Sequence, residues 1–389
     1  MKNLGILISL LLITISGKSQ TFIPGQVYYG TDSFTEYRAG NLPIILSAPH
    51  GGYLTPASLP DRVCAGCVTG RDSYTQELTR QIEASLLFKT GCYPHVIINR
   101  LHRKKLDANR EIIEATDSNT VTETYWHDYM NFVDSAKDLL YEQYPKGIFF
   151  DIHGHGHTIQ RIELGYLLKG SELRQNDSAL NTTPLNSKTS ILNLKFSNLN
   201  SYSHAELIRG THSFGSMLER KGYPTVPSDS IPHPLSGEPY FNGGYNTVKF
   251  GSRNGGTIDA IQIESHQSVR FTSNARTLYA DSLAEAMLEY IEKHYFMNFS
   301  NGYCNYLSSI PKTETYDLTI YPNPTSGKLF FNGLNKNSNY QLITIQGKII
   351  QSGEIEANSS IDLSLIPNGI YFIKLIDEEN LLVKKIIKK

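Results

Sequence analysis

Residues 148–157, IFFDIHGHGH, join a run of apolar residues to three histidines. A short continuous apolar run is typical of a strand that helices cover on both faces. Runs of the same kind occur at 43–49 (PIILSAP), 95–100 (HVIINR) and 259–265 (DAIQIES). The stretches between and after these runs are helical in pattern, at 73–90, 123–144, 213–222 and 275–295. This alternation predicts an α/β domain from about residue 41 to residue 295.

Two segments of this region lack such patterns. Residues 170–203 are polar and rich in asparagine, and we expect them to run over the surface near the site. Residues 231–247, IPHPLSGEPYFNGGYNT, contain prolines and glycines that disfavour regular structure. We interpret this second segment as an irregular loop rather than a lid.

The length and charge of the chain limit the classes of protein it can belong to. With 389 residues it exceeds what one hydrophobic core usually organises, so we expect two folded units. Its 36 lysines and arginines nearly balance 37 aspartates and glutamates, which gives a net charge of −1. A balanced chain has no overall field that attracts nucleic acid or an anionic membrane. We therefore expect a small-molecule or peptide-like substrate.

The first residues, MKNLGILISLLLITISGKSQ, have the composition of a secretory signal peptide. A lysine precedes an apolar run that is too short to span a membrane comfortably, and small residues follow that run. We expect cleavage before Gln20, so that residues 1–19 are the signal peptide, and no transmembrane segment after it.

Export bears on the four cysteines, because disulfides persist outside the cytoplasm. Four cysteines permit three pairings, and we favour Cys64 with Cys67 and Cys92 with Cys304. The CAGC motif alone does not indicate zinc, since a cysteine-type structural site needs further ligands at regular spacing.

Residues suited to chemistry follow the expected strands. His50 follows the first strand, the basic segment 101–110 follows the second, His153 ends the third and Glu264 ends the fourth. In a sheet of mostly parallel strands, ligands bind beyond the carboxyl ends of the strands. The sequence therefore predicts a functional site at this edge of the sheet.

A zinc ion is the expected occupant of that site. Catalytic zinc takes three protein ligands and leaves a fourth position for water. His50 and His153 are the expected nitrogen ligands. Asp72 is the first candidate for the third ligand, although a carboxylate at that position is equally suited to capping the helix that follows. Asp61 is a weaker candidate.

Other polar residues have expected supporting roles. Asp151 is placed to orient an imidazole through its second nitrogen. His155 and His157 are candidates for contacts around the metal or with the substrate. Glu264 is the expected general base and acid, which takes a proton and passes it to the leaving nitrogen; its alternative is a surface carboxylate in a salt bridge.

The segment NRLHRKKLDANR, residues 99–110, is dense in cations. Most of such a cluster is expected to form a solvated face. A guanidinium nevertheless matches the planar shape of a carboxylate, so an arginine directed into the site would select acidic substrates. Arg110 is the first candidate for this role and Arg270 is the second.

Five motifs, in this order along the chain, resemble the N-formylglutamate amidohydrolase family. They are LSAPHGG (46–52), GRDSYTQELTRQI (70–82), HRKKLDANR (102–110), FFDIHGHG (149–156) and IQIE (261–264). Relatives of this family include poly-γ-glutamate hydrolases and, more distantly, zinc carboxypeptidases. The resemblance implies a three-layer α/β/α fold with a mixed sheet and one zinc ion.

The resemblance also implies roles for single residues. Carried over motif by motif, it assigns His50, Asp72 and His153 as the metal ligands. It assigns Asn109 and Arg110 as the clamp for the substrate carboxylate, and Glu264 as the general acid/base. The chain departs from the carboxypeptidase pattern in one respect, because no glutamate follows closely after His50. The identity of the carboxylate ligand therefore stays open.

After Cys304 the pattern changes to short β-rich segments separated by turn signals, which predicts a small antiparallel β-sandwich. YPNPTSGKL (321–329), NGIYFIKL (368–375) and the ending KKIIKK resemble the C-terminal sorting domain of the type IX secretion system of Bacteroidetes bacteria. This resemblance implies export by the type IX machinery, with the protein released or anchored at the cell surface. We expect this domain over residues 316–389, after a catalytic domain over residues 20–310.

These features predict a secreted zinc-dependent hydrolase that cleaves an amide bond in an acidic or carboxylate-bearing substrate. The alternative is a non-catalytic cell-surface protein that binds acidic ligands on the same fold. The sequence contains neither a G-x-S-x-G elbow nor a Walker-type phosphate loop, which speaks against a serine hydrolase and against nucleotide chemistry. Export fits a γ-glutamyl polymer or a peptidoglycan fragment better than formylglutamate itself.

Overall fold

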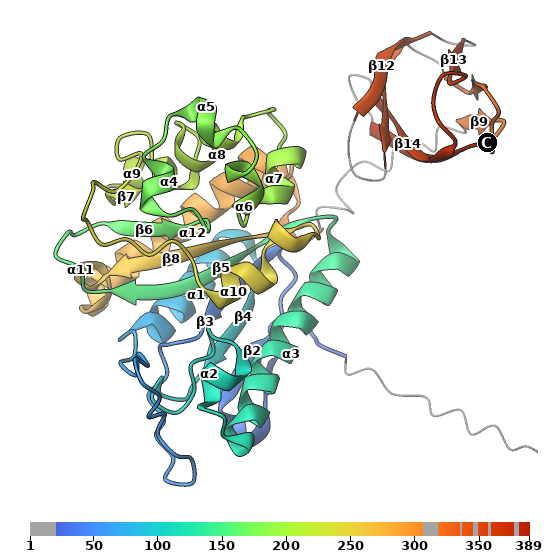
Figure 1. The fold of residues 1–389 in the computed structure, drawn as a ribbon. Coiled ribbons are helices and arrows are strands. Elements are labelled where there is room, and N and C mark those ends of the chain that lie inside the picture. Colours follow the sequence, from blue (N-terminus) through green and yellow to red (C-terminus); the bar gives the residue numbers. More distant parts are fainter. Residues whose placement is uncertain (1–20, 306–317, 335–336, 345–348, 357–358, 377–380) are drawn as a thin grey trace, which may run out of the picture.

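A computed structural model describes most of the chain, and Figure 1 shows its fold. The described residues are 21–305, 318–334, 337–344, 349–356, 359–376 and 381–389. The expected signal peptide, residues 1–19, lies outside them. Within the described residues, no helix is long and apolar enough to cross a membrane.

An eight-stranded mixed sheet forms the centre of the larger region, with the strand order β1-β2-β4-β3-β5-β8-β6-β7. The strands are β1 (Val27–Tyr29), β2 (Thr35–Arg38), β3 (Ile44–Ala48), β4 (His95–Asn99), β5 (Gly147–His155), β6 (Ile162–Gly165), β7 (Thr225–Val226) and β8 (Ile258–His266). The four strands expected from the sequence are the four central strands of this sheet, and all four run parallel. Strands β2 and β6 are antiparallel to their central neighbours, so the sheet is mixed.

The four expected helices are present as α1 (Thr75–Thr90), α3 (Thr120–Gln143), α9 (Phe214–Arg220) and α12 (Ser273–His294). Shorter helices lie between them, namely α2 (Ile112–Thr116), α8 (His204–Arg209), α10 (Tyr245–Phe250) and α11 (Gln267–Arg270). The expected surface excursion at 170–203 contains four short helices, α4 (Gly170–Leu173), α5 (Asp177–Leu180), α6 (Leu185–Lys188) and α7 (Leu192–Ser197). One leucine in each of these four helices is buried, so this segment packs on the core more closely than its polarity indicates.

Helices cover both faces of the central sheet. On one face, Phe149 of β5 packs against Phe250 of α10, with ring centroids 5.3 Å apart. On the opposite face, Phe150 packs against Phe214 of α9 at 5.2 Å. Because successive strand residues point to opposite faces, these two contacts place α10 and α9 on opposite sides of β5.

The strand register gathers polar side chains on one of these faces. Ser47, Asp151 and Gln262 are neighbours across β3, β5 and β8, and they share a face with the next row along the strands. That next row is His153 on β5, Glu264 on β8 and Glu163 on β6. The residues that point the other way from β5 and β8 include Phe150, Ile152, Ile261 and Ile263, which are fully buried and apolar.

The C-terminal residues form two antiparallel sheets. One has the order β13-β10-β9 and the other β12-β11-β14-β15. The strands are β9 (Thr319–Tyr321), β10 (Lys328–Asn332), β11 (Ser338–Thr344), β12 (Ile349–Ile355), β13 (Ser360–Asp362), β14 (Gly369–Ile376) and β15 (Leu381–Lys388). One apolar cluster contains residues of both sheets, including Leu329 and Ile373, and it is separate from the core of the larger region.

The favoured cysteine pairing is confirmed. Cys64 forms a disulfide with Cys67, and Cys92 forms one with Cys304. The second disulfide spans 212 residues, so it ties the end of the larger region to the loop before β4.

Candidate metal centre

Two imidazoles and a carboxylate meet at the carboxyl ends of β3 and β5. The Nδ1 atom of His153 lies 3.1 Å from Oδ2 of Asp72, and Nδ1 of His50 lies 3.5 Å from the same oxygen. All three donor atoms lie within 4.8 Å of one another, and all three residues are buried. The two histidines are separated by about a hundred positions in the sequence and come together because β3 and β5 are parallel neighbours.

A carboxylate holds the second nitrogen of each imidazole. Nε2 of His50 lies 2.6 Å from Oδ1 of Asp107, and Nε2 of His153 lies 2.9 Å from Oδ2 of Asp151. This contact fixes the ring and leaves Nδ1 as the metal-facing atom, an arrangement that metal-binding histidines usually show. Asp151 has the place expected from the sequence. Asp107 was missed, although it lies within the quoted motif HRKKLDANR.

The donor atoms fit a zinc ion. Nδ1 of His50 is buried and forms no hydrogen bond with any residue that the structure describes, so its lone pair has no other use. Burial opposes ionisation of Asp72, but the adjacent imidazoles of His153 and His50 hold the pKa of its carboxyl well below the usual range. Two neutral nitrogens and one carboxylate oxygen are a common ligand set for catalytic zinc.

The geometry distinguishes Asp72 as a metal ligand from two alternatives, which are Asp72 as a helix cap and Asp61 as the ligand. The side chain of Asp72 faces the imidazoles, and the N-terminus of α1 at Tyr74 has no side-chain cap. Asp61 is half-exposed and pairs with Lys104 and Lys105. Asp72 therefore lies at the candidate centre, and Asp61 does not.

Glu264 lies beside the candidate centre. It is the cross-strand neighbour of His153, is 5 % exposed, and accepts a hydrogen bond of 2.9 Å from the side-chain amide of Gln262. Burial raises the pKa of Glu264 to about 8. A carboxyl group with a pKa near neutral can both accept and release a proton during a reaction, which is what general acid/base chemistry requires.

The two arginines expected to bind substrate have other contacts. Arg110 is part-exposed, and its Nε donates to Glu114 at 2.9 Å. The guanidinium of Arg270 packs against Gly154 and donates to the main-chain carbonyls of Ser73, Ser265 and His155. Arg270 thus connects α11 to the ends of β5 and β8, and its hydrogen-bonding groups are largely used within the fold.

Arg103 lies beside the candidate centre. Its Nε donates to Oδ2 of Asp107 at 2.9 Å, and its NH1 lies 3.7 Å from Oδ1 of Asp72. It therefore stabilises both carboxylates that the imidazole of His50 contacts. The sequence did not single it out, because it lies among several other cations.

Asn109 also reaches this centre. Its Nδ2 lies 3.3 Å from Nε2 of His153, and its Oδ1 accepts the main-chain N–H of Asn246 at 2.7 Å. Gly244 lies against this amide so closely that a Cβ there would come within 2.4 Å of it. The irregular loop expected at 231–247 therefore ends against Asn109.

The remaining expected residue, His155, lies on the same polar face. Its Nε2 donates to the main-chain carbonyl of Arg161 at 2.9 Å, and it lies beside His157 and Glu163. Among the described residues, no hydrogen bond or ring contact joins His155 to His50, Asp72 or His153. The structure thus separates the polar face into two clusters.

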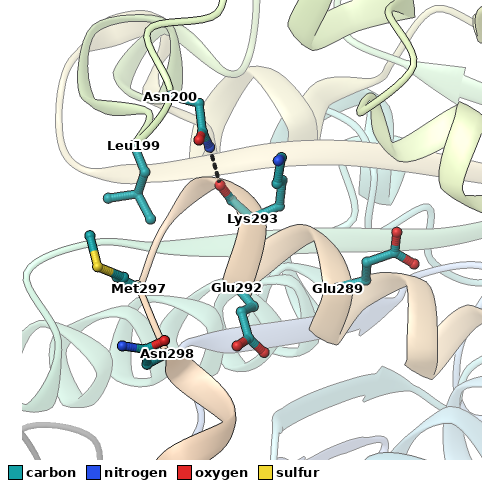
Figure 2. A pocket seen from close by; sticks show the side chains of 7 residues that line it. All are labelled: Leu199, Asn200, Glu289, Glu292, Lys293, Met297 and Asn298. Atoms are coloured by element: carbon teal, nitrogen blue, oxygen red, sulfur yellow. Dashed lines mark hydrogen bonds between the residues drawn. The ribbon is translucent and has the colours of Figure 1, made fainter.

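A surface pocket elsewhere contains none of these residues. Figure 2 shows this pocket of about 410 Å³, where Asn200 donates to the main-chain carbonyl of Lys293. Its carboxylates have partners, since Glu289 pairs with Arg220 and Glu292 accepts from Ser300. We assign no chemistry to this pocket.

Comparison with known proteins bears mainly on the C-terminal region. Residues 319–389 match the family described as Secretion system C-terminal sorting domain. No curated protein sequence matches the chain significantly.

Two solved structures show partial likeness. One is gene product Atu2144 from Agrobacterium tumefaciens, with 12% identity over 68% of this chain and 97% of that chain and a TM-score of 0.41. The other is PorZ, a surface component of the type IX secretion system of Porphyromonas gingivalis, with 14% identity over 19% of this chain and 11% of that chain and a TM-score of 0.17. Both scores are too low to establish a common fold.

The family match agrees with the two antiparallel sheets found after residue 318. It also begins three positions after the boundary that the sequence predicts at 316. Residues 319–389 are a C-terminal sorting domain of the type IX secretion system, so the protein interacts with that machinery and is exported to the cell surface or released.

Proposed function

We propose that the protein is a secreted zinc-dependent hydrolase that cleaves an amide bond in an acidic or carboxylate-bearing substrate. The observation that carries this proposal is the cluster of His50, Asp72 and His153, in which both Nδ1 atoms face one carboxylate oxygen while the second nitrogens contact Asp107 and Asp151. Such outer carboxylates are typical of zinc centres.

The chemistry divides between the metal and the protein. His50, Asp72 and His153 would hold a zinc ion, which would supply Lewis acidity and a nucleophilic water near neutral pH. Glu264, buried beside His153, accepts the proton of the attacking water and passes it to the leaving nitrogen. Gln262 holds the carboxyl of Glu264 in place through a hydrogen bond.

The resemblance to the N-formylglutamate amidohydrolase family supports the same reaction class. The motifs that carry the resemblance contribute His50, Asp72, Asn109, His153 and Glu264, and all five lie at one edge of the sheet. On this proposal the larger region is a three-layer α/β/α domain of the zinc carboxypeptidase type, and the C-terminal sheets are a β-sandwich. Export places the substrate outside the cell, where γ-glutamyl polymers and peptidoglycan fragments are acidic amides.

Cleavage of defined amides tests the proposal. The full-length protein, loaded with zinc, is incubated with γ-glutamyl peptides, N-acyl-glutamates and a peptidoglycan-derived peptide, and free amine is measured. We expect release of amine from at least one acidic amide and none after the zinc is removed by a chelator. A protein that contains no metal and cleaves none of these amides would contradict the proposal.

The Glu264→Gln variant distinguishes an enzyme from the alternative, a binding protein that does not turn over its ligand. If the protein is an enzyme, this variant keeps its metal and its ligand binding but loses product formation by about 10²-fold or more. A wild-type protein that binds the acidic amides with unchanged affinity in the variant, and forms no product in either, would favour the alternative. The neighbouring Gln262→Glu variant is not used, because it adds a second buried charge.

A further inference from the structure

A second cluster of two imidazoles and a carboxylate lies on the same polar face. It contains His155, His157 and Glu163, whose donor atoms also lie within 4.8 Å of one another. His155 and Glu163 are buried, whereas the side chain of His157 is 21% exposed. The cluster is therefore enclosed by the fold on most sides and reaches the solvent beside His157.

The geometry of this cluster reproduces that of the first one. Nδ1 of His157 lies 3.0 Å from Oε1 of Glu163, compared with 3.1 Å between His153 and Asp72. The two imidazoles have ring centroids 4.7 Å apart in each cluster. Donor atoms about 3 to 3.5 Å apart are what ligands at zinc distances of about 2 Å produce.

The outer contacts of the second cluster are also of the kind that metal ligands make. Nε2 of His155 donates to the carbonyl of Arg161 at 2.9 Å, which leaves its Nδ1 without a proton. Among the residues that the structure describes, that Nδ1 accepts the main-chain N–H of His157 at 3.2 Å, a contact that metal binding would replace. The second oxygen of Glu163 accepts the main-chain N–H of Phe241 at 2.9 Å.

Each of the two clusters has an arginine close to its carboxylate. Nε of Arg161 lies 3.9 Å from Oε1 of Glu163, and NH1 of Arg103 lies 3.7 Å from Oδ1 of Asp72. Arg161 also pairs with Glu238 at 2.8 Å, which offsets its charge. The positive charge beside Glu163 is therefore no greater an obstacle to a cation than the one beside Asp72.

The two clusters lie on either side of Glu264. The register places His153, Glu264 and Glu163 side by side on β5, β8 and β6. Neighbouring strands are about 4.8 Å apart, so the outer two positions are separated by about 10 Å. This distance exceeds the roughly 4 Å of a bridged two-metal site, so the second cluster would act separately on the substrate.

We infer that His155, His157 and Glu163 form a second divalent metal site, whose open position beside His157 binds a carboxylate of the substrate. The role in substrate binding rests on the proposed function, whereas the metal site itself does not. This site would supply an anchor for an anionic group in addition to Arg110, whose Nε donates to Glu114, and Arg270, whose Nε donates to a main-chain carbonyl.

Metal content of the full-length protein tests the site. The protein is equilibrated with zinc, freed of excess metal by gel filtration, and analysed for bound zinc. We expect about two zinc ions per chain in the wild type, about one in either His50→Ala or His157→Ala, and almost none in the double variant. His127→Ala, at an exposed histidine outside both clusters, is the matched control and should keep both ions.

The result that overturns the site is one zinc ion per chain that His50→Ala abolishes and His157→Ala leaves in place. Glu163→Gln guards against misfolding, because glutamine keeps a carbonyl oxygen for the N–H of Phe241 while removing the charge. This variant should have the wild-type circular dichroism spectrum and still lose one ion. A folded Glu163→Gln variant with two ions also overturns the site.

The role as an anchor is tested with glutarate and its uncharged analogue glutaramide as probes, by calorimetry. We expect glutarate to bind the wild type at least 10-fold more tightly than glutaramide, and His157→Ala to remove this preference. Equal affinities in the wild type, or an unchanged preference in His157→Ala, overturn the anchor. Absence of amide cleavage would contradict the proposed function but would leave the zinc count of His157→Ala as a test of the site.

Discussion

The two clusters on the polar face of the sheet have similar ligands but differ in what holds the imidazoles. In the first cluster, Asp107 and Asp151 contact the second nitrogens of both histidines. In the second cluster, a main-chain carbonyl contacts His155, and no carboxylate holds a second nitrogen among the described residues. A charged outer partner raises the basicity of an imidazole more than a carbonyl does, so the first cluster should bind a metal ion more tightly.

The largest expected effect comes from breaking the first cluster at His153. In His153→Ala the proposed zinc ion would lose a ligand that is 1% exposed and that water cannot replace without loss of affinity. We expect amide cleavage to fall by more than about 10³-fold and one zinc ion to be lost. Rates on an acidic amide, measured beside His157→Ala, check whether the first cluster is the centre of the reaction. Equal losses of amide cleavage in His153→Ala and His157→Ala would contradict the assignment of the first cluster as the centre of the reaction.

The next effect concerns the opposite face of the same strand. Phe150 is fully buried and packs against Phe214, so Phe150→Ala should lower the free energy of unfolding by about 3 to 5 kcal/mol. Denaturant unfolding of the larger region measures this change. The folded variant should keep the zinc content of the wild type, because Phe150 points away from both clusters. Loss of zinc at full folding would show that the two faces are not independent.

The buried carboxyl groups of Asp107, in the loop after β4, and Asp259, on β8, differ in their partners, and pH should reveal the difference. Charges of His50 and Arg103 lower the pKa of Asp107 despite its burial, whereas burial raises the pKa of Asp259 to about 6 from an ordinary 3.8. Hydrogen bonds from Ser252 and Tyr295 only partly offset the burial of Asp259.

Because the pKa of Asp259 is higher in the folded chain, its contribution to stability is complete below about pH 3.8 and is lost as the pH rises through about 6. This loss is on the order of 3 kcal/mol. Asp259→Asn cannot titrate at this position. The free energy of unfolding of the variant, relative to that of the wild type, should therefore rise by about that amount between pH 4 and pH 7. Parallel stability curves over this range would contradict the prediction.

The smallest expected effect tests the outer carboxylate directly. Asp107→Asn keeps an oxygen for His50 but removes the charge, so zinc affinity should fall by about 10- to 100-fold. Competition with a chelating dye measures this affinity. The control is Asp61→Asn, whose carboxylate pairs with Lys104 and Lys105 instead of the imidazoles and should leave the affinity unchanged. A larger loss of zinc affinity in Asp61→Asn would indicate that Asp61 is a metal ligand.

Part of this fold was predictable because local pattern determines it. The four apolar runs are β4, β3, β5 and β8, the buried centre of the sheet, where both faces require apolar residues. The outer strands β1, β2, β6 and β7 were not predicted. They have between two and four residues each, too few for a periodic pattern to emerge.

The site was predictable to the extent that its residues end a central strand. His50 and His153 have this position, and Glu264 lies at the same level of its own strand. Asp107 and Glu163 were not singled out. Asp107 lies in a loop after β4, and Glu163 belongs to β6, whose approach to β8 depends on the packing of distant segments.

The sequence by itself determined the central parallel strands, the major helices, the export of the protein and the two histidines of the first cluster, because these follow from short-range periodicity and motif. Only the tertiary structure decided which carboxylate faces those histidines, which arginines remain engaged within the fold, and that His155 joins Glu163 instead of His153. The physical reason is that these contacts form between segments far apart in the chain, and their geometry depends on how the strands are ordered in the sheet.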